Sequence, residues 1–374
     1  MKYYIIAGEA SGDLHASNLM KALKKVDPDY SFRFWGGDLM QQEGGKPVKH
    51  YRDLAFMGFA EVIMNLPTIL GNLSFCKKDI EEFEPDVIIF VDYPGFNLRI
   101  AKWARKKGYK THFYISPQIW AWKENRIKDI RRDVDELYVI LPFEKEFYEA
   151  KHNYPVNFVG HPLIDAISDL PPVDVQKFRQ EYGLDDRPVI ALLPGSRKQE
   201  ISKMLEIMLS ITEDFKDYQF VIAGAPSQEE DFYNSFIKKK NVHLVMNRTY
   251  DLLGISKAAL VTSGTATLET ALFKVPEVVC YKGNFISYQI AKRIIDLDFI
   301  SLVNLIMDRE VVKELIQNDF NKENLKKELH KILEEDHRKK IFSDYYELEQ
   351  KLGGMGASEK TARLIYEKIS SNEG

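Results

Sequence analysis

Short apolar runs alternate along the first half of the chain with longer stretches whose apolar residues recur at helical spacing. The runs are rich in β-branched and aromatic residues and carry few charges. Near-continuous apolar strands separated by helices are typical of a parallel sheet that helices cover on both faces. The pattern predicts strands at residues 3–7, 86–91, 111–115 and 136–140.

A second series of such runs lies at residues 188–193, 220–224, 242–245, 259–262 and 278–281. The repeated alternation, in a chain of 374 residues, predicts two doubly wound α/β domains, at 1–165 and 166–344. A Gly- and Pro-containing stretch at 160–172 is the expected hinge. Because open α/β sheets bind ligands at the carboxyl ends of their strands, we expect a cleft between those ends of the two sheets.

The tail from Asn321 onward is rich in Lys, Glu and Leu and is expected to be helical, apart from the Gly-rich residues 353–356. We expect its last part, about 345–374, either to pack on the first domain or to exchange with a partner subunit in a homodimer. No internal repeat or low-complexity tract interrupts this organisation.

Composition favours a soluble globular protein: 45% of the residues are hydrophobic, 29% are charged and the net charge is −4. This charge gives no argument for nucleic acid, although Lys and Arg are dense at 102–110 and 123–132, where they form either a solvated face or an anion-attracting surface. The two cysteines are too few for a disulfide framework, so we expect the cytoplasm. The first residues read as a strand rather than a signal peptide, and no apolar run reaches the roughly 18 residues of a spanning helix.

The segment from Phe56 to Cys76 is unusually apolar, with Glu61 as its one acidic residue before Lys77. Gly58, Pro67 and Gly71 interrupt it too often for a spanning helix. Three interpretations stay open: a helix lying in the plane of a membrane, a pocket for acyl chains, or ordinary core.

Polar residues follow the first predicted strand in a Gly-rich turn. Its glycine spacing fits neither a dinucleotide-binding fingerprint nor a Walker loop. Alternatively, Ser11 and Asp13 merely cap the next helix. The candidates for catalysis in this turn are Glu9, Asp13 and His15, with Ser11 and Gly12 as candidate substrate contacts.

Asp92 directly follows the strand at 86–91 and precedes a Pro-Gly turn, with Asn97 a little further on as a candidate substrate contact. A carboxylate at a strand end is well placed to accept a proton from a substrate hydroxyl. An Asp that only hydrogen-bonds the turn is the competing account. After the next strand, Gln118 and Trp120 are candidates for holding a sugar, although two neighbouring Trp residues serve equally well as core anchors.

In the second domain a strand ending at Thr262 breaks into a Ser-Gly-Thr turn and a helix. The free N–H groups and dipole of a helix N-terminus attract phosphate, although most such turns only cap helices. Arg197 follows another strand and offers a bidentate fork to a diphosphate. Glu269 lies within reach of a sugar hydroxyl, and Asn304 is a neutral donor. The candidate phosphate contacts in the turn are Ser263, Gly264, Thr265 and Thr267.

The sequence has no metal-binding motif such as Asp-x-Asp, His-Glu-x-x-His or Cys-x-x-Cys. We therefore expect neither a metal nor another cofactor. Arg197 and helix amides would then neutralise a leaving diphosphate.

Six motifs in order along the chain together resemble the lipid-A-disaccharide synthase family. The resemblance implies a GT-B glycosyltransferase with two Rossmann-like domains facing a cleft, metal-independent and inverting, at the inner face of a Gram-negative cytoplasmic membrane. Its donor is UDP-2,3-diacylglucosamine and its acceptor is 2,3-diacylglucosamine 1-phosphate; the products are the β-1,6-linked disaccharide 1-phosphate and UDP. The motifs occupy residues 8–13, 116–122, 141–144, 158–162, 193–197 and 263–269.

By the same resemblance Asp92 is the candidate base, Arg197 is the diphosphate-binding arginine, and Glu269 and Asn304 are ligand contacts. His15 departs from the family, in which small residues are common at this position, and it is a rival for the base. Two other functions remain as alternatives: a UDP-sugar epimerase of the same fold, and a non-catalytic, membrane-associated nucleotide-sugar sensor.

Overall fold

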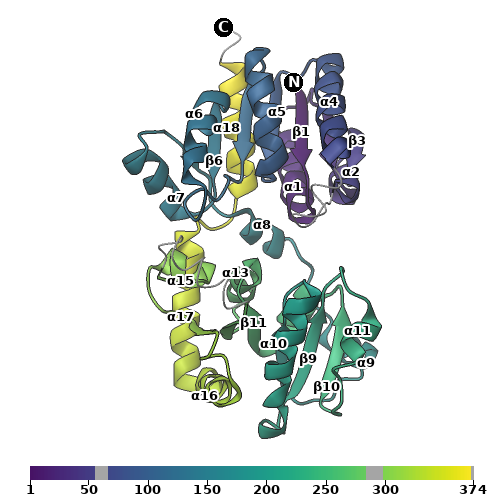
Figure 1. Cartoon of the computed structure of the whole chain (residues 1–374), viewed down its shortest axis with the longest axis vertical. Coiled ribbons are helices and arrows are strands. Elements are labelled where there is room, and N and C mark those ends of the chain that lie inside the picture. Colours follow the sequence, from purple (N-terminus) through teal and green to yellow (C-terminus); the bar gives the residue numbers. More distant parts are fainter. Residues whose placement is uncertain (55–65, 284–297, 372–374) are drawn as a thin grey trace. The chain divides into compact units, whose positions relative to one another are not determined.

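The computed structural model describes residues 1–54, 66–283 and 298–371 and divides the chain into two compact units (Figure 1). Unit 1 comprises Met1–Asp169 and Leu352–Gly374, and unit 2 comprises Leu170–Lys351. The chain therefore leaves unit 1 after Asp169 and returns to it at Leu352. As a result, the C-terminal helix of the protein belongs to the N-terminal unit.

Unit 1 is built on a seven-stranded sheet in which every neighbouring pair is parallel, in the order β3-β2-β1-β4-β5-β6-β7. The central strands β1 and β4 are buried, apart from the exposed Lys2 at the start of β1, because helices cover both faces. The strands are β1 Lys2–Ala7, β2 Ser31–Gly36, β3 Lys46–His50, β4 Val87–Val91, β5 Thr111–Tyr114, β6 Glu136–Val139 and β7 Asn157–Phe158.

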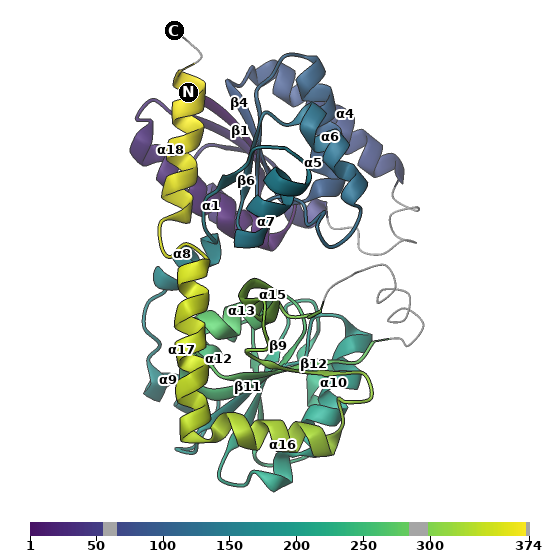
Figure 2. The same ribbon diagram turned by 90° about the vertical axis from the view of Figure 1, so that its left-hand side faces the viewer.

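Figure 2 shows α4, α5 and α6 on one side of this sheet and α1 with α18 on the other. Apolar side chains of α4, α5 and α6 and of alternate sheet residues such as Ile6 and Phe90 form one core cluster. The C-terminal helix α18 packs against α1 and α8 of its own chain. The helices are α1 Ala10–Val26, α2 Asp38–Gln42, α4 Leu66–Phe83, α5 Pro94–Lys106, α6 Ile127–Asp133, α7 Pro142–Glu146, α8 Pro162–Ser168 and α18 Ala357–Ser370.

Unit 2 has a six-stranded parallel sheet in the order β10-β9-β8-β11-β12-β13. Side chains of α9 and α12 pack on one of its faces, around Ala191 and Val261. Its strands are β8 Val189–Leu193, β9 Gln219–Gly224, β10 Val242–Met246, β11 Ser256–Thr262, β12 Glu277–Tyr281 and β13 Lys313–Ile316. Its helices are α9 Val175–Glu181, α10 Lys198–Ser210, α11 Glu230–Asn234, α12 Thr249–Ile255, α13 Thr265–Leu272, α15 Leu302–Met307, α16 Lys322–Leu333 and α17 Glu335–Lys351.

The prediction of two parallel α/β sheets is confirmed, and every predicted strand is present. The predicted helical tail is also confirmed, with residues 353–356 separating α17 from α18. The sequence pattern missed β2, β3, β7 and β13. Three of these carry charged residues within the strand, and β7 has only two residues, too short for a recognisable apolar run.

The register of each parallel sheet brings particular strand ends together. In unit 1, Ala7 of β1 pairs with Val91 of β4, and Val91 pairs with Tyr114 of β5. The loops that begin at Gly8, Asp92 and Ile115 are therefore adjacent. In unit 2, Leu193 of β8 pairs with Val261 of β11, so the turns that follow these two strands are also neighbours.

Within the described parts of the chain, no helix combines the length and the apolar character needed to cross a membrane. The first part of the apolar segment from Phe56 to Cys76, residues 56–65, lies outside those parts. The remainder belongs to α4, where Leu73 and Cys76 are buried while Leu70 and Phe75 are 57% and 48% exposed.

Candidate functional site

Asp92 follows β4 in a backbone conformation that is uncommon for a residue with a side chain. Both Asp92 and Tyr93 are left-handed, with φ of 46° and 49°. Such conformations persist only where the surroundings hold them, and they gather at functional sites. The amide of Asn97 supplies part of the support, because its Nδ2 donates to the backbone oxygen of Asp92 over 2.7 Å.

The ring of Tyr93 supplies another part of the support. It lies so close over Gly8 that a Cβ on this glycine would be 2.2 Å from a ring carbon. The Tyr93 hydroxyl donates to the backbone oxygen of Leu54 at 3.4 Å. Only a glycine at position 8 lets the end of β1 approach the turn that carries Asp92.

The pKa of the half-buried Asp92 carboxyl is raised to about 6, first by burial and then by the negative charge of Glu9. The backbone N–H of Tyr93 opposes this rise. Glu9 is exposed at the N-terminus of α1. A carboxyl group that titrates near neutrality is suited to exchange a proton with a substrate hydroxyl.

Asp13 is placed differently from the prediction. Its carboxylate is buried and accepts hydrogen bonds from the N–H groups of Gly37, Leu39 and Met40, at 2.7 to 3.1 Å. It thereby caps α2 rather than offering a base, and the side chains of Ser11 and Asp13 do not cap α1 as the alternative proposed. Ser11 is exposed in the first turn of α1, and Gly12 packs against Ala7.

His15 is half-buried on α1, and burial lowers the pKa of its imidazole to about 4, partly offset by the charge of Asp165. Its Nδ1 atom has no hydrogen-bond partner among the described residues. Asp165 itself caps α18 by accepting from the N–H groups of Gly356 and Ser358 at 2.7 and 2.9 Å. The imidazole is therefore neutral at pH 7 and lies in the electrostatic field of the α8–α18 junction.

Asn97, predicted as a substrate contact, lies in the interior of unit 1. The residue is completely buried, and its Nδ2 faces the backbone oxygens of Asp92, Val91 and Ile6. It therefore holds the end of β4 against β1 and positions the backbone of Asp92 from beneath. Its Oδ1 has no hydrogen-bond partner among the described residues, and the substrate contact at this position stays a prediction.

The loop after β5 presents its residues in different ways. Gln118 is exposed, while Trp120 is half-buried with its ring edge-on to Phe143 at 4.8 Å. Trp122 is 49% exposed, and the charged ends of Lys123 and Arg126 lie 4.4 and 5.5 Å from its ring centre. The Trp120 ring is therefore held by its packing on Phe143. The Trp122 ring forms an exposed aromatic and cationic surface together with Lys123 and Arg126.

Glu144 is a residue that the sequence analysis did not single out. It is buried, and its Oε2 accepts from the N–H groups of Ile140 and Leu141 at 3.1 and 2.9 Å. Burial raises the pKa of its carboxyl to about 7 despite these hydrogen bonds. The sequence Pro142-Phe143-Glu144 is typical of a helix start and therefore predicts that Glu144 caps α7. It does not predict that the Glu144 side chain is buried.

Unit 2 has a pocket of about 290 Å³ at the carboxyl ends of β8, β9 and β11. It lies where open α/β sheets bind ligands and includes the predicted Ser-Gly-Thr turn. The pocket is lined by Leu193, Pro194, Gly195, Ser196, Glu200, Ala223, Ala225, Pro226, Thr249, Thr262, Ser263, Gly264, Thr265, Ala266 and Glu269.

The turn after β11 exposes backbone rather than side-chain donors. Gly264 has φ of 157° and ψ of −163°, a region that essentially only glycine adopts, and the space where a Cβ would stand is open. The hydroxyls of Ser263 and Thr267 donate to the backbone oxygens of Ile300 and Gly264. The N–H groups of the first turn of α13, beginning at the exposed Thr265, are therefore the donors available to an anion.

Thr262 is a second group that sequence reasoning missed. It is 4% exposed and lines the pocket, and its Oγ1 has no hydrogen-bond partner within the described chain. Buried hydroxyls usually have a partner, so this one is available to a ligand. Its position as the last residue of β11 was visible in the sequence, but the absence of a partner was not.

Glu269 lies in the pocket wall one turn into α13 and is half-buried. Burial raises the pKa of its carboxyl, and a hydrogen bond from Tyr250 opposes the rise. The Tyr250 hydroxyl donates to Oε1 of Glu269 at 3.0 Å.

Arg197 immediately follows the pocket-lining Ser196 and precedes α10. Its side chain is exposed and, among the residues that the structure describes, has neither an ion pair nor a side-chain hydrogen bond. The guanidinium is therefore free to bind an anion. The preceding Gly195 has φ of 98°, which directs the loop away from β8.

Asn304, also predicted as a ligand contact, lies inside unit 2. It is completely buried, and its Nδ2 donates to the backbone oxygen of Val312 and to Glu314, both at 2.9 Å. Its Oδ1 accepts from the N–H groups of Val311 and Val312. Both amide hydrogens and the oxygen are occupied inside unit 2, so in this arrangement Asn304 ties α15 to β13 and offers no donor to a substrate.

In residues 1–54, 66–283 and 298–371, no group of three or more His, Cys, Asp or Glu side chains has a metal-binding arrangement. Cys76 and Cys280 are both buried free thiols.

Residues 3–367 match the sequence model of the family described as lipid-A-disaccharide synthetase. The lipid-A-disaccharide synthase of Syntrophus aciditrophicus is 39% identical over 378 residues, covering 99% of this chain and 98% of the relative. That of Geobacter metallireducens is 37% identical, covering 98% and 96%.

Among solved structures, the Neisseria meningitidis UDP-GlcNAc 2-epimerase bound to UDP-GlcNAc resembles this chain with a TM-score of 0.66 at 14% identity, covering 99% of this chain and all of the epimerase. The calicheamicin glycosyltransferase CalG4 has a TM-score of 0.59 at 13% identity, covering 99% and 98%. At these identities the likeness shows the fold alone, that of GT-B epimerases and glycosyltransferases.

Proposed function

The chain belongs to the lipid-A-disaccharide synthase family. We propose that the pocket of unit 2 binds the donor of that reaction and that the strand ends of unit 1 around Asp92 act on the acceptor. The activity is that of a lipid-A-disaccharide synthase, a glycosyltransferase. It transfers 2,3-diacylglucosamine from UDP-2,3-diacylglucosamine to 2,3-diacylglucosamine 1-phosphate. The full-length family match is the observation that carries this assignment.

Unit 2 binds the UDP donor in this proposal. The first-turn N–H groups of α13 and the Arg197 guanidinium receive the diphosphate, and the open backbone at Gly264 allows it to approach closely. Glu269 accepts hydrogen bonds from sugar hydroxyls. The unpartnered Thr262 and the exposed Arg197 support this proposal.

Unit 1 supplies the base. Asp92 removes the proton from the acceptor hydroxyl as that oxygen attacks the anomeric carbon, and UDP leaves with inversion. Its raised pKa supports this role, because a more basic carboxylate is a better proton acceptor. His15 is the weaker rival, since an imidazole with a pKa of about 4 accepts a proton less readily at pH 7.

We also propose that the protein acts as a peripheral protein on the cytoplasmic face of the inner membrane, where both acylated substrates are found. The exposed Leu70 and Phe75 of α4, and Trp122 between two cations, support contact with a lipid surface. A homodimer formed by exchange of the C-terminal tail remains a proposal as well.

The reaction is tested by incubating purified protein with UDP-2,3-diacylglucosamine and 2,3-diacylglucosamine 1-phosphate in mild detergent, with and without EDTA. Mass spectrometry is expected to detect the disaccharide 1-phosphate and UDP in equal amounts, at the same rate in both samples. A matched incubation with UDP-N-acetylglucosamine alone tests the epimerase. Epimer formation without disaccharide, or UDP-sugar binding without any turnover, would contradict the proposal.

A further inference from the structure

We propose that Tyr250 is a positioning residue that orients Glu269 toward the ribose hydroxyls of the donor nucleotide. The inference rests on the proposed function, because it requires a UDP-sugar in the pocket of unit 2. The observation that carries it is the single hydrogen bond from the Tyr250 hydroxyl to Oε1 of Glu269, at 3.0 Å.

Tyr250 is itself held in place. Its ring packs against Phe273 at 5.3 Å between ring centres and joins the apolar cluster between α12 and the sheet. The neighbouring Thr249, on the same helix, lines the pocket beside Glu269. A side chain fixed by packing can fix a second side chain through a hydrogen bond, so the Glu269 carboxylate is oriented before a ligand arrives.

The hydrogen bond leaves capacity for a ligand. An ionised carboxylate has about four lone-pair sites on two oxygens, and Tyr250 occupies one site on Oε1. Oε2 and the unused lone pair of Oε1 can accept hydrogen bonds from two adjacent hydroxyls. The ribose 2′ and 3′ hydroxyls form such a vicinal diol. The hydrogen bond also opposes the rise that burial causes in the Glu269 pKa, which favours the charged and stronger acceptor.

A purely structural account is that this hydrogen bond only ties α12 to α13. The two accounts differ in what the loss of the Tyr250 hydroxyl does to ligands. Loosening of the helices would weaken every nucleotide to a similar degree. Misplacement of the Glu269 carboxylate would weaken only a nucleotide that carries ribose hydroxyls.

The test measures the Kd of UDP and of 2′,3′-dideoxy-UDP for the full chain and for Tyr250→Phe by calorimetry. We expect about tenfold weaker binding of UDP by the variant, the scale of one hydrogen bond to a charged group, and binding of the dideoxy nucleotide within about twofold of the unsubstituted chain. Tyr182→Phe removes a hydroxyl from another ring of the same unit and is expected to change neither value. In a Glu269→Ala background, Tyr250→Phe should have no further effect on UDP binding.

Equal weakening of both nucleotides, or additive losses in the Glu269→Ala background, would overturn the positioning role and favour the structural account. Unchanged UDP binding by Tyr250→Phe would overturn it too. If the unsubstituted chain binds both nucleotides equally well, Glu269 does not recognise ribose, and the inference fails while the proposed function stands. If it binds neither, both fail.

Discussion

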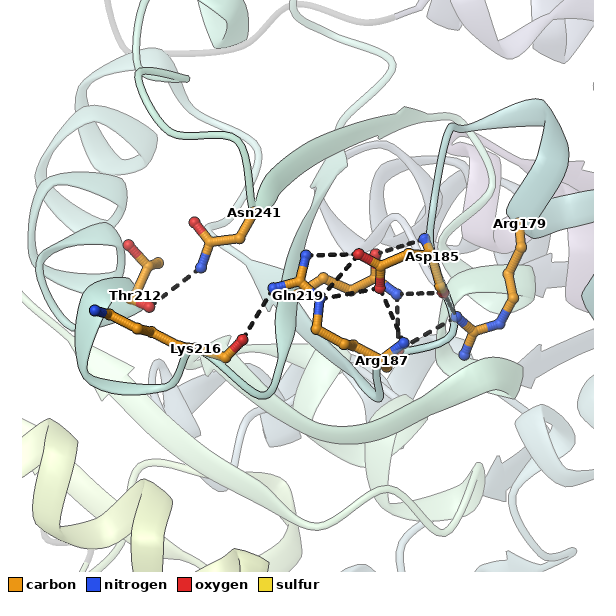
Figure 3. A network of polar contacts seen from close by, with 7 residues as sticks. All are labelled: Arg179, Asp185, Arg187, Thr212, Lys216, Gln219 and Asn241. Atoms are coloured by element: carbon orange, nitrogen blue, oxygen red, sulfur yellow. Dashed lines mark hydrogen bonds and ion pairs between the residues drawn. The ribbon is translucent and has the colours of Figure 1, made fainter.

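The two ends of the parallel sheet in unit 2 use their polar side chains in opposite ways. At the amino end, Gln219 is completely buried, and its Nε2 donates to the backbone oxygens of Asp185 and Arg187 at 2.9 and 2.7 Å (Figure 3). Its Oε1 accepts from the N–H of Asp185 at 3.2 Å. Arg187 in turn donates to the backbone oxygen of Lys216, so these loops are tied to one another.

At the carboxyl end the polar groups are left available. Thr262 has a buried hydroxyl without a partner among the described residues, Arg197 is exposed, and Gly264 leaves its backbone open. Buried polar groups without partners destabilise a fold, so the unpartnered Thr262 hydroxyl beside the pocket is a group that a ligand can use. The comparison teaches that Gln219 and Arg187 stabilise the loops at the amino end, whereas the groups at the pocket are those proposed for binding.

Unit 1 repeats the contrast. At the amino end of β5, the N–H of Thr111 donates to Asp135 at 3.0 Å and its hydroxyl donates to the backbone of Asp133 at 2.9 Å. At the carboxyl end of β4, Asp92 combines a left-handed backbone with a raised pKa.

Glu277, at the amino end of β12 in unit 2, is an exception to the hydrogen bonding found at the amino ends of the strands. Both of its carboxyl oxygens are buried without a partner among the described residues, and burial raises the pKa of this carboxyl well above its usual value.

The largest effect is expected at the carboxyl end of unit 1. Asp92→Asn keeps the size of the side chain but removes the base, so kcat should fall by about 10²- to 10⁴-fold while the Kd for UDP stays unchanged. Disaccharide formation and UDP calorimetry measure the two quantities. Asp336→Asn, at a fully exposed side chain, is the matched control and should retain full activity. Unchanged turnover in Asp92→Asn would move the base to His15.

A smaller loss is expected at the carboxyl end of unit 2. Arg197→Ala removes a charge-assisted contact to the diphosphate, so donor KM should rise by about 10- to 100-fold. Arg197→Lys keeps the charge but loses the fork and should be affected less. Steady-state kinetics at varied UDP-sugar concentration measure both variants. A normal KM in Arg197→Ala would remove this residue from the donor site.

The amino end should respond in stability instead of activity. Gln219→Ala removes three hydrogen bonds to the backbone. The oxygens of Asp185 and Arg187 keep a hydrogen bond from Arg179, while the N–H of Asp185 loses its bond to Gln219. The free energy of unfolding should therefore fall by about 2 kcal/mol, with little change in kcat at 25 °C. Urea titration gives the first value and the disaccharide assay the second. Gln180→Ala, at an exposed position of α9 in the same unit, should change stability by less than about 0.5 kcal/mol. A loss of kcat in Gln219→Ala without a loss of stability would contradict the purely structural role of the amino end.

The smallest effect concerns pH. In the proposed mechanism the base is the ionised Asp92 carboxylate, whose pKa is raised to about 6, so kcat/KM should fall as the pH drops through this value. The negative charge of Glu9 raises that pKa, so Glu9→Gln should lower it and shift the acid limb of the profile to lower pH. Glu82→Gln, an equal charge change at an exposed position of α4, should leave the limb in place. A shift toward higher pH after Glu9→Gln would contradict the electrostatic argument.

Local sequence was sufficient for the strands with continuous apolar runs. It also placed Arg197 and the turn at Gly264 in loops that follow the buried strands β8 and β11, and their binding roles stay predictions. It was not sufficient for β2, whose Arg33 breaks the apolar run; this arginine is accommodated by an ion pair with Asp79, which lies on a helix far along the chain. A charge inside a strand is tolerable only when such a distant partner is present.

The sequence by itself determined the family, the two parallel α/β sheets and the positions of the strand ends that carry the candidate site residues, because apolar periodicity and turn residues act over short distances. Only the tertiary structure decided which polar side chains face those ends. In the sequence, Asp13 and Asn304 were as good candidates for substrate contacts as the pocket residues. In the structure, Asp13 accepts from backbone N–H groups about 25 residues away, and Asn304 accepts from N–H groups 7 and 8 residues away. A hydrogen-bonding side chain can serve a ligand only where folding leaves part of its hydrogen-bonding capacity unused, and that depends on contacts between segments that the local pattern does not describe.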